Sequence, residues 1–185
     1  TVAYGAGKDE LVQNGVAVTA KDVGTVWGRP VGPVPTWFRE VWYPKFVRKC
    51  ARLRELYALD QGVAIWAAHA MKGPGGIAQH ALRGVPPGLL KGQDGVMEVL
   101  RRADEAWTSL IIDFCGVDAA KVGVVERAIL TRKIFGELGH MSAVDLAMSA
   151  STAGLATAFP VLASIANANG VSMAQWAGVL GVPAL

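Results

Sequence analysis

Apolar side chains recur at helical spacing along most of the chain after Pro35. Between residues 45 and 59 they fall at intervals of four, three and four, which is the repeat of one helix face. They are Phe46, Cys50, Leu53 and Tyr57. A longer pattern runs through residues 97–115, in the order Val99, Leu100, Ala103, Trp107, Leu110, Ile111 and Phe114. The two patterns predict two long amphipathic helices.

Capping and breaking residues set the expected helix boundaries in the first part of this region. Thr36 is expected to cap a short helix over residues 37–43 that ends at Pro44, which is also the first residue of the next helix. Asp60 is expected to cap a helix over residues 61–72, which Gly73 closes. The Gly- and Pro-rich stretches 73–76 and 84–88 are predicted to be loops with a short helix between them.

The second part contains further cap signals. Asp118 is predicted to cap a helix over residues 119–138, and Ser142 with Asp145 predicts a helix that reaches about residue 159. Pro160 either kinks that helix or starts a new one that runs to residue 169. Ser172 and Gln175 form a capping box for a last helix ending near residue 181. The sequence therefore predicts an all-α domain, residues 36–185, built as a single bundle of seven or eight helices.

Residues 1–35 have a different composition. Glycines alternate with short β-prone stretches, and three prolines fall within residues 30–35. Proline removes backbone donors and favours extended geometry, so the segment is predicted to be an extended arm. Such an arm lies across its own domain or across a neighbouring subunit, or forms a short hairpin.

Charge is distributed unevenly. The net charge is only +3, and no Asp, Glu, Lys or Arg occurs in residues 146–185. Because the surface helices of a monomer normally carry charged faces, this segment is expected to be buried in the core, between subunits or in a bilayer. The hydroxyl groups and Pro160 within residues 146–165 argue against a bilayer. We therefore expect burial, partly between subunits, and no membrane.

Six of the 18 basic residues fall between Arg39 and Arg54. Lys45, Arg48, Lys49 and Arg52 follow i, i+3, i+4, i+7 spacing and share one helix face beside the apolar stripe. Like charges at this spacing destabilise a helix, and an anionic partner offsets that cost. The face therefore predicts binding to the phosphates of a nucleic acid, and a solvated face remains the alternative.

Other residues extend or limit this prediction. Trp37, Trp42 and Tyr43 precede the basic cluster and either stack on bases or pack in the core. Two basic pairs on predicted helices are secondary candidates, and they are Arg101 with Arg102, and Arg132 with Lys133. Arg102 has the alternative of pairing with Glu98 or Glu105 at helical spacing.

No catalytic signature is present. The three histidines have no metal-site spacing, and the chain contains no G-x-S-x-G or H-E-x-x-H motif. Asp104, Glu105 and Asp113 are interpreted as solvated helix-face residues or caps. Cys50 and Cys115 are too few for a disulfide framework and are expected to be reduced in the core. The chain is thus expected to be a non-enzymatic cytoplasmic protein without cofactor or metal.

Residues 162–179 read LASIANANGVSMAQWAGV, with Ala166 at a close crossing, Gly170 at a turn and Ser172 as a cap. This stretch resembles a helix-turn-helix unit. The resemblance implies a DNA-binding regulator, although the second helix carries no Arg, Lys or Asn to reach the bases. A tight αα-corner explains the same residues.

The arm, the basic face and the uncharged segment together predict an assembly subunit. In architecture this resembles the helical coat and nucleocapsid proteins of RNA viruses. The expected function is packaging of single-stranded RNA, with homo-oligomer contacts through the arm and residues 146–185, in the cytoplasm and, for a virus, in the virion. A helix-turn-helix regulator that uses residues 162–179, and a helical enzyme or ligand-binding protein with a polar pocket, remain as alternatives.

Overall fold

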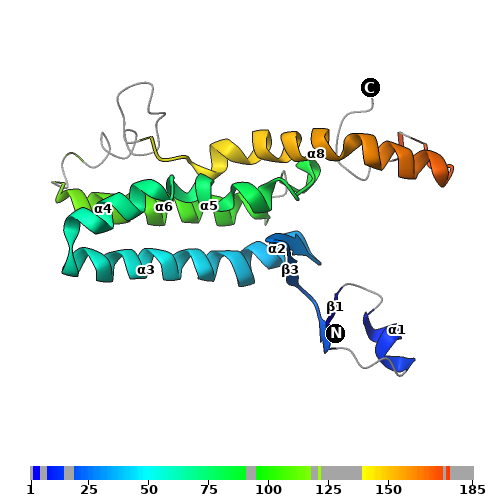
Figure 1. Ribbon diagram of the computed structural model, residues 1–185, viewed down its shortest axis with the longest axis horizontal. Coiled ribbons are helices and arrows are strands. Elements are labelled where there is room, and N and C mark those ends of the chain that lie inside the picture. The colour runs from blue at the N-terminus through cyan, green and yellow to red at the C-terminus, as the bar shows by residue number, and fades with distance from the viewer. Residues whose placement is uncertain are drawn as a thin grey trace.

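The protein is mostly helical, which confirms the predicted all-α class. The computed structural model describes residues 2–4, 8–14, 19–90, 95–117, 121, 139–172 and 174–175. Five α-helices of ten residues or more lie in these ranges (Figure 1). They are α3 (Tyr43–Leu59), α4 (Gln61–Ala70), α5 (Gly73–Leu82), α6 (Val96–Cys115) and α8 (Ala143–Ala168).

The predicted number of seven or eight helices is not supported. The expected boundary at Pro44 is absent, since α2 (Val34–Trp37) continues through a π-helical turn, Phe38–Trp42, into α3. In that turn the Tyr43 N–H donates to the Phe38 carbonyl. The wider turn lies immediately before Pro44, which has no N–H to continue the α-helical ladder. The helices expected over residues 119–138 and 172–181 lie largely outside the described residues.

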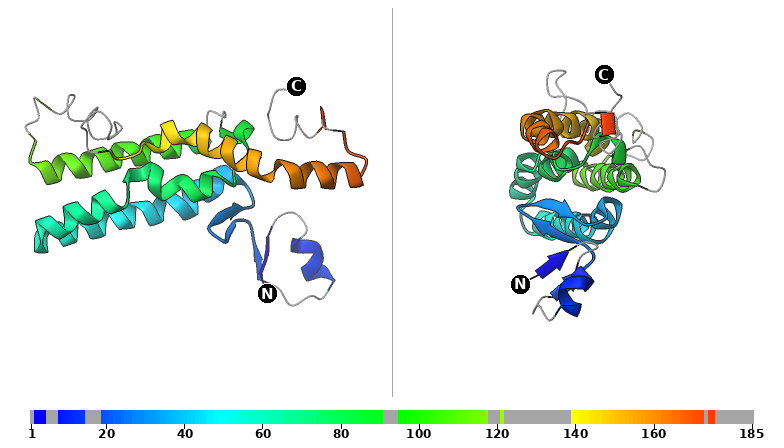
Figure 2. Two further views of the ribbon diagram at one scale, coloured as in Figure 1. Left: turned by 45° about the horizontal axis from the view of Figure 1, so that its top comes forward. Right: turned by 90° about the vertical axis from the view of Figure 1, so that its right-hand side faces the viewer.

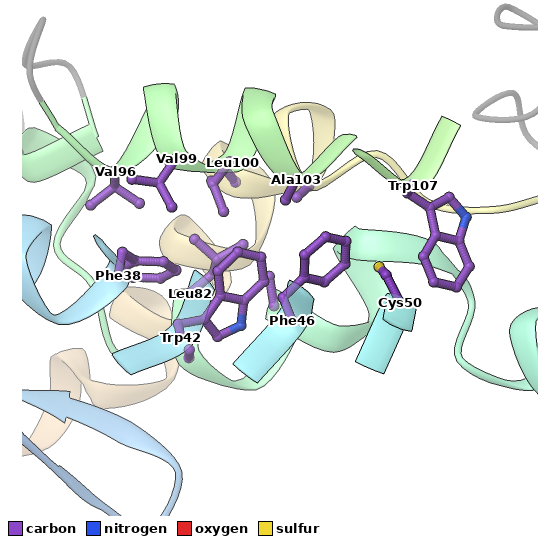
Figure 3. Close-up of a cluster of buried hydrophobic side chains, with 14 of the residues drawn as sticks. Phe38, Trp42, Phe46, Cys50, Leu82, Val96, Val99, Leu100, Ala103 and Trp107 are labelled. Carbon is purple, nitrogen blue, oxygen red and sulfur yellow. The ribbon is translucent and has the colours of Figure 1, made fainter. Parts of the chain in front are cut away.

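The core lies between α3 and α6 and is closed by α5 (Figure 3). Phe46 of α3 and Trp107 of α6 are almost fully buried, with ring centroids 6.3 Å apart. Trp42 stacks on Phe46 at 5.4 Å, and Leu82 of α5 is fully buried in the same cluster. The apolar residues predicted to line one face of each helix therefore do form the core.

The stretch predicted to be a loop at residues 73–76 is instead the first turn of α5. Pro74 is favoured there because the N–H groups of a first turn have no helical partner. The Gly75 N–H donates to the Met141 carbonyl at 2.7 Å, and a Cβ on Gly75 would lie 2.7 Å from the Ser142 carbonyl oxygen. The glycines thus allow the chain that leads into α8 to approach the backbone of α5.

The residues of the predicted arm contain short elements. The strands β1 (Val2–Tyr4) and β2 (Thr19–Lys21) pair in parallel, and α1 (Lys8–Gln13) lies between them in sequence. The strands β3 (Gly24–Val26) and β4 (Arg29–Val31) form an antiparallel hairpin with Trp27 and Gly28 at its turn. This hairpin contacts the helical body, since Trp37 Nε1 donates to Thr25 Oγ1 at 2.9 Å. The extent of the arm, residues 1–35, stays a prediction.

α8 crosses the bundle and extends beyond it (Figures 1 and 2). Pro160 lies inside this continuous helix and does not divide it. The first part of α8 packs on α5 and α6, where Ala147, Ala150 and Ser151 are buried. Of residues 152–168 only Ala166 is buried. Core packing therefore accounts for only the first part of the uncharged segment 146–185, as far as it is described.

The contact between α8 and the end of α5 requires a glycine. A Cβ on Gly154 would lie 2.0 Å from the Arg83 carbonyl oxygen, whereas a Cβ on Gly62 of α4 would make an ordinary van der Waals contact with Asp60 Oδ1 at 3.5 Å. We expect Gly154→Ala to lower the free energy of unfolding by about 1–3 kcal/mol through overpacking. Gly62→Ala should raise it by up to about 1 kcal/mol, because alanine favours the helix. Urea unfolding of both variants checks this, and stabilisation by Gly154→Ala would contradict the described contact.

Candidate nucleic-acid-binding face

α3 presents two faces of opposite character. Phe46, Cys50 and Leu53 point into the core, and none of these residues is more than 3% exposed. The cations predicted from the spacing are all exposed, and we call them the basic face; they are Lys45, Arg48, Lys49 and Arg52. Because the apolar stripe anchors α3, the helix holds these cations on a rigid support.

The basic face has no carboxylate partner within the described part of the chain. Salt bridges there join Arg54 to Asp113 and Arg101 to Glu98, and neither includes a residue of the basic face. Arg48 Nε donates to the Pro44 carbonyl, one turn earlier on the same helix, at 3.3 Å. Within the described residues none of the four cations is therefore neutralised by a salt bridge, as expected of a surface that binds anions.

Arg54 belongs to a different environment. Its guanidinium donates to Asp113 on α6 at 3.1 Å, and both side chains are about half exposed. This pair links the ends of α3 and α6. Asp113, interpreted from the sequence as a solvated helix-face residue or cap, is thus an exposed ion-pair partner.

The two basic pairs named as secondary phosphate-binding candidates have different surroundings. Arg101 is exposed and forms an ion pair on its own helix with Glu98, one of the two alternative partners that the sequence offered for Arg102. The Arg102 guanidinium instead lies over the Tyr43 ring, 5.0 Å from its centroid. Arg132 and Lys133 lie outside the described residues.

The aromatic residues that precede the basic cluster pack in the core. Trp37 and Trp42 are buried, and Tyr43 is half-buried and stacks on Phe46. The described aromatic with the largest exposure is Trp27, which is 91% exposed at the tip of the β3–β4 hairpin, with φ of 48°. Trp27 is not among the residues predicted from the sequence. The one available signal was Gly28 between two short β-prone stretches, and it was weak because a two-residue hairpin turn favours Asn, Asp or Gly where this chain has Trp27.

A buried polar cluster joins α6 to the start of α8. The Asp104 carboxylate accepts hydrogen bonds from the Ser142 hydroxyl at 2.6 Å, from the Ala143 N–H at 2.8 Å and from the Val144 N–H at 3.2 Å. The Ser142 Oγ in turn accepts from the Asp145 N–H at 3.1 Å, which confirms the predicted cap. From the sequence, Asp104 was interpreted as a solvated helix-face residue or a cap. It is a cap, but it caps the start of α8 and not its own helix, α6.

His140 completes this cluster. Trp107 Nε1 donates to His140 Nδ1 at 3.1 Å, and His140 Nε2 is buried without a partner among the described residues. Ser142 donates to Asp104 and not to His140, so the three residues do not form the relay of a nucleophilic triad. The cluster is a structural junction.

Burial shifts the pKa values of both titratable groups in this junction. It raises the pKa of Asp104, and the hydrogen bonds from Ser142, Ala143 and Val144 oppose that rise. Burial, and to a smaller extent the charge of His69, whose ring lies 5.9 Å away, lower the pKa of His140 to about 4. The folded protein thus holds His140 neutral.

The pH dependence of stability follows from these directions. The folded pKa of His140 lies below the ordinary value of 6.5, so its contribution is full above that pH and is lost as the pH falls toward 4. The loss amounts to at most about 3 kcal/mol. Asp104 acts in the opposite sense, because its raised folded pKa favours the folded state at low pH. Urea unfolding at pH 7 and pH 5 should show a smaller difference for His140→Gln than for the wild type. An equal difference would contradict the assignment.

No metal-binding group is found in the described residues, where no three His, Cys, Asp or Glu side chains are arranged to hold an ion. The two cysteines differ from expectation in one respect, since Cys50 is buried and Cys115 is exposed. Burial raises the pKa of the Cys50 thiol to about 11, so this side chain behaves as a core residue and not as a nucleophile.

The helix-turn-helix resemblance can be followed only in its first part. Ala166 is buried, Gly170 has a φ of 66°, and the Val171 N–H donates to the Ala166 carbonyl at 2.9 Å. The Ser172 N–H donates to Gln175 Oε1 at 2.9 Å and the Gln175 N–H donates to Ser172 Oγ at 3.3 Å, as the capping box predicted. Most of the second helix lies outside the described residues, so its function stays a prediction.

Comparison with known proteins identifies no relative of this chain. Searches of protein-family models, of curated proteins and of solved structures find no match to this chain. The function of the chain is therefore inferred from the geometry of the basic face.

Proposed function

We propose that the protein is a non-enzymatic, self-assembling subunit of coat or nucleocapsid type that packages single-stranded RNA through the basic face of α3. One observation carries the proposal. Four exposed cations share one side of α3, and none of them forms an ion pair in the described part of the chain. The proposed location is the cytoplasm, and the virion if the chain belongs to a virus.

The arrangement suits a phosphate backbone. The basic face extends over two helical turns, about 10 Å, with neighbouring Cβ atoms about 5–6 Å apart. Because α3 is anchored by its core stripe, ordering these cations on binding costs less entropy than ordering a flexible tail. Trp37 and Trp42 are buried, so recognition by this face is through phosphates and independent of base sequence.

Salt dependence of binding tests this function. Fluorescence anisotropy with a labelled single-stranded RNA is expected to give an affinity that falls steeply with salt, each phosphate contact adding about −0.7 to the log–log slope. The double variant Lys45→Ala, Lys49→Ala should flatten the slope by about 1.4. Arg54→Ala is the matched control, because Asp113 already holds that guanidinium, and its slope should equal that of the wild type.

Two results would contradict the proposal. One is a slope that the double variant leaves unchanged. The other is tight binding of one duplex DNA sequence that unlabelled single-stranded RNA does not displace, which would favour the helix-turn-helix alternative.

A further inference from the structure

Trp27, at the tip of the β3–β4 hairpin, contradicts the preference of its own turn. Its backbone φ of 48° lies in the left-handed region, which Asn, Asp or Gly adopts at lower cost than a bulky residue. The side chain recovers none of that cost by burial, because the residue is 91% exposed. A residue that is unfavourable in its turn and adds nothing to the core is typical of a functional surface.

The backbone of this tip is held in place from two sides. His80 Nε2 of α5 donates to the Trp27 carbonyl oxygen at 2.7 Å, and Trp37 Nε1 donates to Thr25 Oγ1 of β3 at 2.9 Å. A Cβ on Gly28 would lie 2.8 Å from His80 Cδ2, so a glycine lets the imidazole reach the turn. The hairpin therefore presents the indole of Trp27 to solvent on a fixed support.

Two exposed arginines lie close to this tip. Arg29 follows the turn directly, and Arg83 ends α5. A Cβ on Gly84 would lie 3.1–3.3 Å from three carbons of the Arg29 side chain, so the stem of Arg29 lies along the residue after Arg83. Neither arginine takes part in a salt bridge among the described residues. Asp22 lies at the other end of the hairpin, where its carbonyl oxygen would be 2.2 Å from a Cβ on Gly32.

The hairpin lies at the end of α3 where the basic face begins. β4 packs against α2, which continues into α3, and Lys45 is the first cation of the basic face. Figure 1 shows β3 beside the start of this helix. A nucleic acid strand that follows the basic face toward the start of α3 therefore approaches the hairpin.

We propose that Trp27 stacks on an unpaired base of a single-stranded nucleic acid, while Arg29 and Arg83 attract the phosphates next to that base. The inference rests on the proposed function and deepens it, because the basic face binds the backbone and Trp27 adds a contact to a base. Stacking on an indole is tolerant of base sequence but requires a free base face. The site thus selects single strands over duplexes, whose bases are already stacked on one another.

The size and charge of the tip favour a base over an apolar partner. Val26, at 43%, and Trp27 are the only exposed large apolar residues of the hairpin, which is too little area for a protein interface. An apolar partner would also remove the neighbouring arginines from water without a counter-charge. One base needs a single ring face, and it brings the phosphates that the arginines lack.

Binding of a short labelled single-stranded RNA to the full chain, followed by fluorescence anisotropy, tests the stacking contact. Trp27→Ala should weaken binding about 5- to 100-fold, which is the effect of one lost base–aromatic stack. Trp27→Phe keeps a ring and should retain most of the affinity. Trp66→Ala, which removes a tryptophan 71% exposed on α4, is the matched control and should bind as the wild type does. None of these variants removes a charge, so all should keep the wild-type salt slope.

Two further measurements separate stacking from a structural role of Trp27. Wild type and Trp27→Ala should bind equally to a strand of the same length that has the sugar–phosphate backbone but no bases. Trp27→Asn suits the left-handed turn, so it should unfold at the same or a higher temperature and still bind RNA as weakly as Trp27→Ala does.

Three results would overturn the inference. The first is a Trp27→Ala variant that binds RNA as the wild type does while the salt slope is intact, a result that leaves the proposed function standing. The second is an equal loss of affinity for RNA and for the abasic strand. The third concerns lipid, because α8 is by length and composition a candidate membrane span among the described residues. Flotation with phosphatidylcholine vesicles that Trp27→Ala abolishes would assign the indole to a membrane.

Discussion

Replacement of Asp104 by alanine is expected to lower the free energy of unfolding by about 2–4 kcal/mol. The substitution leaves the Ser142 hydroxyl and the N–H groups of Ala143 and Val144 without their acceptor. Buried donors without partners, and a helix start without its cap, each cost about 1–2 kcal/mol. Urea unfolding monitored by circular dichroism measures the change.

Two companion variants identify the cause. Asp104→Asn keeps one oxygen acceptor but replaces the other with an NH2 donor, so at least one backbone N–H loses its acceptor, and the variant should cost about 1–2 kcal/mol, less than Asp104→Ala. Asp113→Ala removes an exposed ion pair on the same helix and should cost less than about 1 kcal/mol. If Asp104→Ala costs no more than Asp113→Ala, the carboxylate does not hold the start of α8 in the way described.

Removal of the whole basic face should weaken RNA binding while stabilising the protein. With Lys45, Arg48, Lys49 and Arg52 all changed to alanine, four phosphate contacts are lost, and affinity at 0.1 M salt should fall by about 100- to 1,000-fold. The same variant loses four like-charge pairs at i, i+3 and i, i+4, so the free energy of unfolding should rise by about 1–2 kcal/mol.

The opposite signs of these two effects distinguish a binding surface from a structural one. A structural role for the four side chains would lower stability when they are removed. Fluorescence anisotropy and thermal unfolding of the same preparation measure both quantities. A variant that binds RNA as the wild type does, or that unfolds at a lower temperature, would contradict the role assigned to this face.

Local signals predicted the parts of the fold that depend on neighbouring residues. The periodic apolar residues located α6 to within one residue, and Asp60 caps α4 as expected, accepting from the Val63 N–H at 2.9 Å. The exposure of the basic face followed from helical spacing in the same way. These features needed no information from distant parts of the chain.

The errors arose where distant residues decide the structure. The composition of residues 73–76 indicates a loop, and only the contact with the backbone at Met141, distant in sequence, shows why glycines begin α5 there. The partners of Asp104 lie 38 or more residues away, and Arg54 meets Asp113 at a separation of 59 residues. The absence of charge in residues 146–185 indicated burial, but that signal is the same for a core, a subunit contact and a bilayer.

Crosslinking on the wild-type protein tests the central claim most directly. Single-stranded RNA is first crosslinked to the protein by ultraviolet light. The protein is then cleaved after glutamate residues, and the peptides that carry crosslinked RNA are identified by mass spectrometry. Cleavage after Glu40 and Glu55 releases residues 41–55 as one peptide that contains the entire basic face. We predict that this peptide carries the main crosslink and loses it in 1 M salt. A main crosslink on residues 127–137, which contain Arg132 and Lys133, or on residues 138–185, with none on residues 41–55, would contradict the account.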